Sequence, residues 1–225
     1  MPKVTFKFDK EKDLFNIWGT CNFKTKWGND FKKGISKNII QLCEGKDFSE
    51  IKEVLGKYQE KPHSLKIIPL VVKSFNDSWN EINDEFFKRL EKVMKKPLCC
   101  DEITAYLTLV SRCPYNYNKD NPYFFVHFFG GIPSILKTAA HEIMHIQFHN
   151  TYWPKIEKQI GKEKTADLKE ALTILLNLEF KDLWFVRDEG YEIHQELRKF
   201  IEKEWKENPD FDILMKKCVE YLKTK

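Results

Sequence analysis

Two histidines and a glutamate form the chemically most informative pattern in the chain. His141 and His145 stand four residues apart, with Glu142 between them in the string His-Glu-Ile-Met-His. Because an α-helix turns once in about 3.6 residues, this spacing places both imidazoles on one helix face, where they can share a Zn²⁺ ion. Glu142 projects in an adjacent direction. From there it can act as a general base that takes a proton from a metal-activated water. The pattern predicts a metal-dependent hydrolase.

The residues around this motif predict a helix that is otherwise buried. Pro133 suits the first turn of such a helix, because a backbone N–H at that position would have no partner within the helix. The opposite face of the segment 133–150 is apolar and consists of Ile135, Ala139, Ala140, Ile143, Met144 and Phe148. The three polar side chains of the motif therefore interrupt a buried helix and do not belong to a solvated face.

A zinc site of this kind needs a third ligand, for which Glu170 is the preferred candidate. Glu170 opens the strongly apolar stretch 170–178, and a carboxylate on a buried helix is costly unless it is paired or bound to a metal. Thr173 and Asn177 continue a polar stripe from it and are candidates to support the ligand. Two different interpretations are a Glu170 that pairs with a nearby lysine, and a third ligand chosen from Glu179, His149 and His194.

The five-residue motif resembles that of the zincin metallopeptidases. The distance from the motif to an acidic residue on a later helix is similar to that in the gluzincin branch, whose third ligand is glutamate. The metzincin branch needs glycine and histidine at two positions where this chain has Phe148 and Thr151. His149 extends the motif to HExxHxxxH, which is similar to compact peptidases of the ImmA/IrrE type, and the small minigluzincins are a further comparison.

This resemblance covers roughly residues 101–200 and implies a peptidase with zinc held by His141, His145 and Glu170. The chain departs from the gluzincin pattern four positions after Glu170, where those enzymes often carry aspartate or another small polar residue and this chain has Ile174. Any supporting role there passes to neighbouring polar residues.

The resemblance also implies a residue beyond the third ligand that stabilises the oxyanion of the tetrahedral intermediate. Tyr191 and His194 stand three residues apart in a segment that opens a new helix after Gly190, so both are expected to face the same way. They are the candidate oxyanion donors. An ordinary structural role at the start of that helix is an equally good interpretation.

The elements that must position these residues are mostly helical. Period-two alternation predicts a short strand at 4–8, and β-branched and aromatic residues predict two more at 103–110 and 123–129. Helical spacing predicts the remaining elements, two between 30 and 60 and the rest at 71–95, 133–150, 153–161, 164–180, 190–206 and 210–223. The sequence therefore predicts an α+β fold, mostly helical, with a small antiparallel sheet packed on the helix that carries the motif.

Nothing in the sequence marks a domain boundary. There is no internal repeat, low-complexity linker or sharp shift in composition along the chain. We predict a single domain over 1–225, with a helical N-terminal part of unknown role at 1–100 and a zincin-like catalytic part at 101–225.

Composition and charge exclude several classes of partner. The 225 residues are 42% hydrophobic and 14% aromatic, as in globular proteins. The net charge is +4 and only four of the 38 basic residues are arginines, so nucleic acid is not expected as a partner. The first fifteen residues lack a secretory pattern, and no apolar run is long enough to span a bilayer. A cytoplasmic protein with no membrane partner is expected.

The six cysteines show no pattern of a zinc knuckle or a disulfide framework. None of them forms a CxxC pair, and Cys99 and Cys100 are adjacent. We expect reduced thiols, which agrees with a cytoplasmic location.

The predicted function is zinc-dependent cleavage of peptide bonds in a peptide or protein substrate, with Glu142 as general base. The alternative is a regulatory or binding protein that retains a zincin-type zinc site with no or very narrow protease activity. A structural zinc site would need four protein ligands, whereas the sequence offers three good candidates. The oligomeric state is not predicted.

Overall fold

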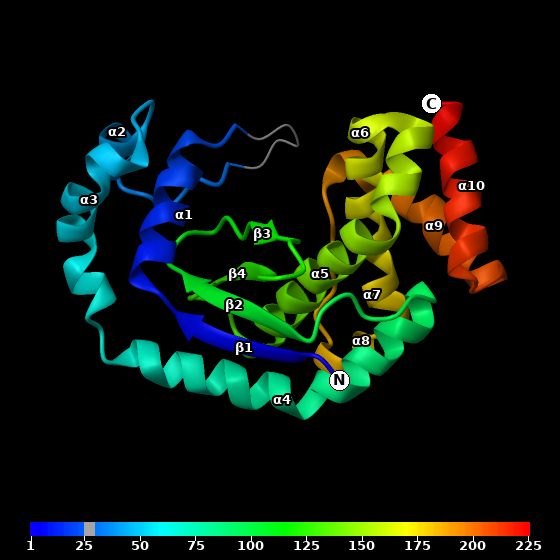
Figure 1. The fold of residues 1–225 in the computed structure, drawn as a ribbon, viewed down its shortest axis with the longest axis horizontal. Coiled ribbons are helices and arrows are strands. Elements are labelled where there is room, and N and C mark those ends of the chain that lie inside the picture. The colour runs from blue at the N-terminus through cyan, green and yellow to red at the C-terminus, as the bar shows by residue number, and fades with distance from the viewer. Residues whose placement is uncertain (25–29) are drawn as a thin grey trace.

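The computed structural model describes residues 1–24 and 30–225 and shows a small sheet surrounded by helices (Figure 1). The elements up to the sheet's second strand are β1 (Lys3–Phe8), α1 (Lys10–Asn22), α2 (Lys37–Cys43), α3 (Phe48–His63), α4 (Ile67–Met94) and β2 (Glu102–Thr108). The sheet is completed by β3 (Tyr115–Asn116) and β4 (Tyr123–His127).

The remainder of the chain is helical. Its elements are α5 (Ile132–Thr151), α6 (Trp153–Leu172), α7 (Ile174–Glu179), α8 (Lys181–Trp184), a 3₁₀ turn (Glu192–His194), α9 (Gln195–Glu207) and α10 (Phe211–Lys223). The prediction of a mostly helical α+β fold is confirmed.

The sheet is mixed, so the prediction of an antiparallel sheet is wrong. Its strand order is β1-β2-β4-β3, in which β1 and β4 both run parallel to β2 and only β3 is antiparallel to its neighbour β4. Composition predicts a plain loop between β2 and β4. The connection instead contains β3, which runs back along β4, and this return leg lets β4 point in the same direction as β2.

Helices α4 and α5 pack against the sheet and against each other. In β1 the residues alternate between buried and exposed, and the buried Phe6 meets Phe75 of α4 edge to face, with ring centroids 6.0 Å apart. Such aromatic contacts add stability beyond the burial of apolar area. Contacts with α4, α6 and β4 place α5, the helix that carries the motif, between the sheet and the C-terminal helices (Figure 1).

Helix α1 is an element that sequence periodicity does not predict. Its buried face combines Leu14 and Ile17 with the polar residues Asp13, Asn16 and Thr20, so its apolar periodicity is incomplete. Asp13 and Asn16 are buried because they bond to β2 and to the segment that follows it. Asp13 Oδ1 accepts hydrogen bonds from the Thr108 hydroxyl, at 2.7 Å, and from a backbone amide.

Two further features concern the whole of the described chain. No helix among residues 1–24 and 30–225 has both the length and the apolar character that crossing a bilayer requires. All six cysteines are free thiols.

Candidate metal centre

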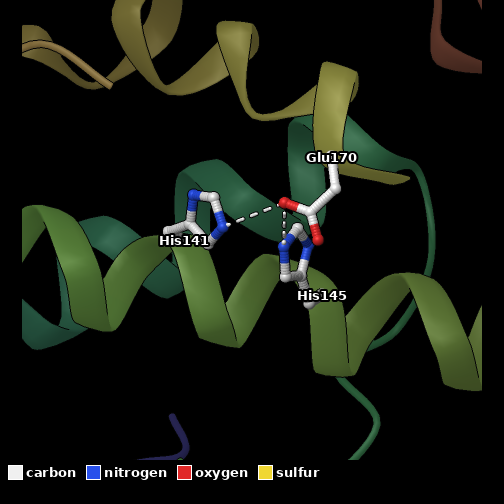
Figure 2. A group of neighbouring side chains, drawn as sticks. All are labelled: His141, His145 and Glu170. Carbon is white, nitrogen blue, oxygen red and sulfur yellow. Dashed lines mark hydrogen bonds and ion pairs between the residues drawn. The ribbon is translucent and has the colours of Figure 1, made fainter. Parts of the chain in front are cut away.

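The two histidines of the motif and Glu170 lie together between helices α5 and α6 (Figure 2). Nε2 of His145 lies 3.3 Å from Oε2 of Glu170, and Nε2 of His141 lies 3.5 Å from the same oxygen. One ligand atom from each residue lies within 4.8 Å of the other two. Both imidazoles come from α5, and the carboxylate comes from the last turn of α6.

These distances fit a zinc ion. Tetrahedral Zn²⁺ binds imidazole nitrogen and carboxylate oxygen at about 2.0–2.1 Å, which places neighbouring ligand atoms about 3.3–3.4 Å apart. The observed separations from Glu170 Oε2 are 3.3 and 3.5 Å. Two imidazoles and one carboxylate are also the donor set of known catalytic zinc sites, which use three protein ligands.

Lys169 fixes the orientation of the Glu170 carboxylate. Its Nζ donates a hydrogen bond to Oε1 of Glu170 at 2.6 Å and another to the hydroxyl of Tyr115 at 3.0 Å. Because Oε1 is bound to lysine, Oε2 is the oxygen that faces the imidazoles. Burial alone would raise the pKa of Glu170, but His145, His141 and Lys169 hold it well below its usual value. Glu170 can therefore pair with a lysine through one oxygen and serve as a ligand through the other.

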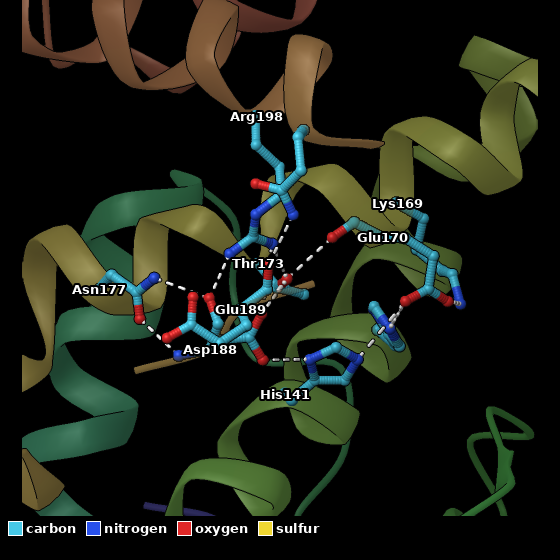
Figure 3. A network of polar contacts seen from close by, with 10 residues as sticks. His141, Lys169, Glu170, Thr173, Asn177, Asp188, Glu189 and Arg198 are labelled. Carbon is cyan, nitrogen blue, oxygen red and sulfur yellow. Dashed lines mark hydrogen bonds and ion pairs between the residues drawn. The ribbon is translucent and has the colours of Figure 1, made fainter. Parts of the chain in front are cut away.

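Asp188 holds the imidazole of His141 from the side opposite Glu170 (Figure 3). Nδ1 of His141 donates to Oδ2 of Asp188 at 2.7 Å, and Asp188 is almost fully buried. Such carboxylate partners orient a metal-binding histidine and fix which nitrogen faces the metal. Nδ1 of His145 is buried and bonds to no described residue, so only one of the two imidazoles is held in this way.

The polar stripe after Glu170 holds Asp188 in place. The hydroxyl of Thr173 donates to Oδ1 of Asp188 at 2.8 Å, and the Asn177 side chain exchanges two hydrogen bonds with the Asp188 backbone. Arg198 forms an ion pair with Asp188 at 3.2 Å. Thr173 and Asn177 thus act on His141 through Asp188. No local pattern in the sequence identifies Asp188 or Arg198, because only the fold brings their segments beside the motif.

The two imidazoles have opposite electrostatic environments. Burial alone would lower the pKa of His141, but the Asp188 carboxylate, assisted by Glu170 and Glu142, outweighs it and raises that pKa to about 10. Burial, assisted by Lys169, lowers the pKa of His145 to about 3. In the metal-free protein His141 therefore carries a proton near neutral pH and His145 does not. A metal ion that binds both must displace the proton of His141.

Glu142 points into the cavity beside the candidate ligands. Only 7% of the residue is exposed, and its Oε2 makes no hydrogen bond with any described residue. Burial raises the pKa of Glu142 to about 7, against the lowering effect of His141 and Lys169. A carboxyl group that titrates near neutral pH is suited to accept and return a proton during catalysis.

A cavity of about 430 Å³ opens onto these groups. Its size lies within the range of about 300–1,000 Å³ that is usual for ligand sites. Phe23 and Phe31 form one wall. The connection from β2 to β3 forms another, through Ser111, Arg112, Cys113, Pro114 and Tyr115. No motif or periodicity in the sequence indicates a role for any of these wall residues.

The two candidate oxyanion donors pack edge to face, with ring centroids 5.7 Å apart, but only one of them lines the cavity. Tyr191 lines the cavity, and burial raises the pKa of its hydroxyl, which therefore stays protonated at neutral pH. His194 is buried outside the cavity lining, where its Nε2 contacts Oδ1 of Asp167 at 3.1 Å. Tyr191 is thus beside the candidate ligands and His194 is not.

His149 and Glu179, two further candidates for the third ligand, are bonded elsewhere. Nε2 of His149 lies 2.7 Å from the Tyr115 hydroxyl, and its ring stacks on Tyr117. Oε1 of Glu179 accepts a hydrogen bond from the indole of Trp205 at 2.7 Å. Neither belongs to the group of candidate ligands.

Comparison of the chain with protein-family models, with curated proteins and with solved structures found no match. The functional conclusions therefore depend on the chemistry of the site. That site combines the residues of the HExxH motif with a carboxylate from the next helix.

Proposed function

We propose that the chain is a zinc-dependent hydrolase that cleaves peptide bonds. In this proposal His141, His145 and Glu170 bind zinc and Glu142 is the general base. The observation that carries it is the position of Glu142, which lines the same cavity as three metal-ligand atoms within 4.8 Å of one another and whose buried Oε2 bonds to no described residue. A purely structural zinc site has no use for such a carboxylate, and it would have a fourth protein ligand.

The proposed mechanism divides the work among the residues of the cavity. Zinc, when bound, supplies Lewis acidity, which polarises the scissile carbonyl and makes water a stronger acid. Glu142 accepts the proton of the attacking water at Oε2 and returns it to the leaving amine. The hydroxyl of Tyr191 donates a hydrogen bond to the oxyanion that develops on the carbonyl.

Two supporting residues keep the ligands in position. Asp188 holds Nδ1 of His141, so that its Nε2 faces Glu170. Lys169 holds one oxygen of Glu170 and leaves the other for the metal. Precise placement of this kind lowers the cost of organising the site during the reaction.

Substitution of Glu142 tests the proposal directly. We expect about one zinc per chain in the purified protein, and we expect Glu142→Gln to keep the zinc and the fold while peptide hydrolysis falls by about 10²–10⁴-fold. Metal analysis, circular dichroism and a fluorogenic peptide library measure these three properties. Glu91→Gln, an exposed change on α4, is the control and should leave all three unchanged. Near-normal turnover in Glu142→Gln would contradict the assignment of the base.

A cytoplasmic location and a peptide or protein substrate are part of the same proposal. The six free thiols support the location, because disulfides are rare in reducing compartments. The shape of the cavity, open and of moderate volume, supports a short stretch of peptide as the ligand.

A further inference from the structure

One cationic side chain in the cavity has no anionic partner among the residues that the structure describes. Arg112 lines the cavity together with the metal ligands and is half-buried. It forms no ion pair with any residue of the ranges 1–24 and 30–225, and residues 25–29 contain no acidic side chain. By contrast, Arg89 pairs with Asp182 and Arg198 pairs with Asp188. A charge in a binding cleft that the protein itself does not neutralise is available to a ligand.

Arg112 does not lose its charge by deprotonation. Burial lowers its pKa, yet a guanidinium stays protonated under all ordinary conditions. The ring of Phe23 lies 4.2 Å from its central carbon and offsets part of the desolvation through a cation–π contact. A carboxylate would offset more, because it accepts two parallel hydrogen bonds from one guanidinium.

Helix α1 holds the backbone of Arg112 and leaves room for its guanidinium. The side chain of Asn16 donates to the Arg112 carbonyl at 2.9 Å and to the Thr108 hydroxyl at 3.0 Å. Gly19 lies under the guanidinium, and a Cβ atom there would be 3.6 Å from Nη1 of Arg112. Because its backbone is held and its guanidinium rests on the ring of Phe23, Arg112 loses less entropy when a ligand binds than a free side chain would.

We propose that Arg112 binds a carboxylate of the substrate, so that the cavity selects peptides with a carboxylate close to the bond that is cleaved. The inference rests on the proposed function, since it names the substrate class of the same site. The aromatic pair Phe23 and Phe31, with ring centroids 6.0 Å apart, forms an apolar wall on the same side and favours an apolar side chain next to that carboxylate. The carboxylate belongs either to the C-terminus of a peptide or to an Asp or Glu side chain.

Two pairs of capped dipeptides distinguish these sources. N-acetyl-Ala-Phe with a free C-terminal carboxylate is compared with its C-terminal amide. N-acetyl-Glu-Phe-amide is compared with N-acetyl-Gln-Phe-amide. Calorimetric titration gives the Kd of each probe for zinc-loaded Glu142→Gln protein, which should turn the probes over far more slowly than the parent, and for the metal-free parent.

Three substitutions are introduced into both backgrounds. Arg112→Gln removes the charge, and Arg112→Lys keeps the charge but loses the planar fork. Arg187→Gln is the matched control, because it removes the same charge from an exposed arginine outside the cavity. Circular dichroism and zinc content verify that each variant is folded.

We expect the carboxylate form of at least one pair to bind about tenfold or more tightly than its neutral form. Arg112→Gln should abolish this preference, Arg112→Lys should restore part of it, and Arg187→Gln should retain all of it. A preference in the first pair identifies a C-terminal carboxylate, and one in the second pair identifies a side-chain carboxylate.

Several results would overturn the role of Arg112. They are equal affinities within both pairs, a preference that survives in Arg112→Gln, and no binding of either carboxylate probe below about 10 mM. A chain that binds no zinc would contradict the proposed function, yet the metal-free titration would still test Arg112. Turnover of peptides irrespective of their carboxylates would leave the hydrolase in place and exclude the role of Arg112.

Discussion

At the scale of single residues, Asp188 is not a metal ligand itself, but its loss should weaken metal binding. Partners of metal-bound histidines typically contribute about 10–100-fold to metal affinity. We expect Asp188→Asn to weaken zinc binding by that factor. An uncharged amide oxygen is a weaker acceptor than a carboxylate for the hydrogen bond from Nδ1 of His141. Competition with a chelator measures the affinity. Asp77→Asn, which removes one partner of an exposed ion pair on α4, should leave it unchanged.

The same contact predicts the titration of His141 in the metal-free protein. Its imidazole should stay protonated across neutral pH and titrate near pH 10, against an ordinary value of 6.5. Because the pKa is raised in the folded state, the contact stabilises the metal-free fold fully below about pH 6.5, and the contribution is lost as the pH rises toward 10. NMR titration of the imidazoles measures the pKa. In Asp188→Asn it should fall clearly below about 10, since the Asp188 contribution is lost while Glu170 and Glu142 still raise it; an unchanged pKa would contradict this account.

At the scale of elements, Gly190 controls how closely the segment after α8 approaches α9. Gly190 has a φ of +65°, and a Cβ atom there would lie 2.7 Å from Nη1 of the buried Arg198. Gly34 also has a positive φ, of +94°, but a Cβ atom there would meet no atom of the described residues within 4 Å. The two glycines therefore separate backbone strain from crowding.

We expect Gly34→Ala to cost only the strain of a left-handed residue, about 1–2 kcal/mol in the free energy of unfolding. Gly190→Ala should cost more and should also weaken zinc binding, because it displaces Arg198 from Asp188. Urea unfolding and chelator competition measure the two effects. Equal losses of stability in both variants, with zinc affinity intact, would show that Arg198 accommodates the methyl group.

How far the sequence predicts each element depends on how local its signal is. The motif helix is fully specified by local periodicity, and observed α5 spans Ile132–Thr151 against a predicted 133–150. Periodicity predicts one continuous helix over 164–180, but α6 ends at Leu172 and α7 begins at Ile174. Strand direction is not local, because it depends on the pairing of β3 with β4. Helix α1 escapes prediction because its buried Asp13 finds its partner on β2 only after folding.

The candidate site divides in the same way between local and non-local signals. Spacing along one helix identifies His141 and His145, and the cost of a buried carboxylate singles out Glu170. Asp188 and Arg112 carry no such signal, since both are ordinary charged residues in connecting segments. Their significance comes from the elements that the tertiary fold places beside them.

At the scale of the whole molecule, the free thiols make a prediction about the compartment. The purified protein is denatured without reductant and alkylated. Intact-mass measurement should then show six modified cysteines. Cys21 and Cys43 are the pair best placed to form a disulfide, because both are fully buried and hydrogen-bonded to each other. A protein in which these two resist alkylation would contain a disulfide, and its expected compartment would have to be revised.

The pairing of β1 with β2 has a consequence for the order in which the molecule assembles. It aligns Lys3 with Glu102, so β1 cannot pair with β2 until about a hundred further residues have been synthesised. Contacts between residues so distant in sequence form slowly, whereas the two motif histidines and Glu170 are separated by fewer than thirty residues. Helix α1 follows β1 directly and supports Arg112. The metal ligands can therefore meet early in folding. The cavity wall that contains Arg112 is completed only after β1 has paired with β2.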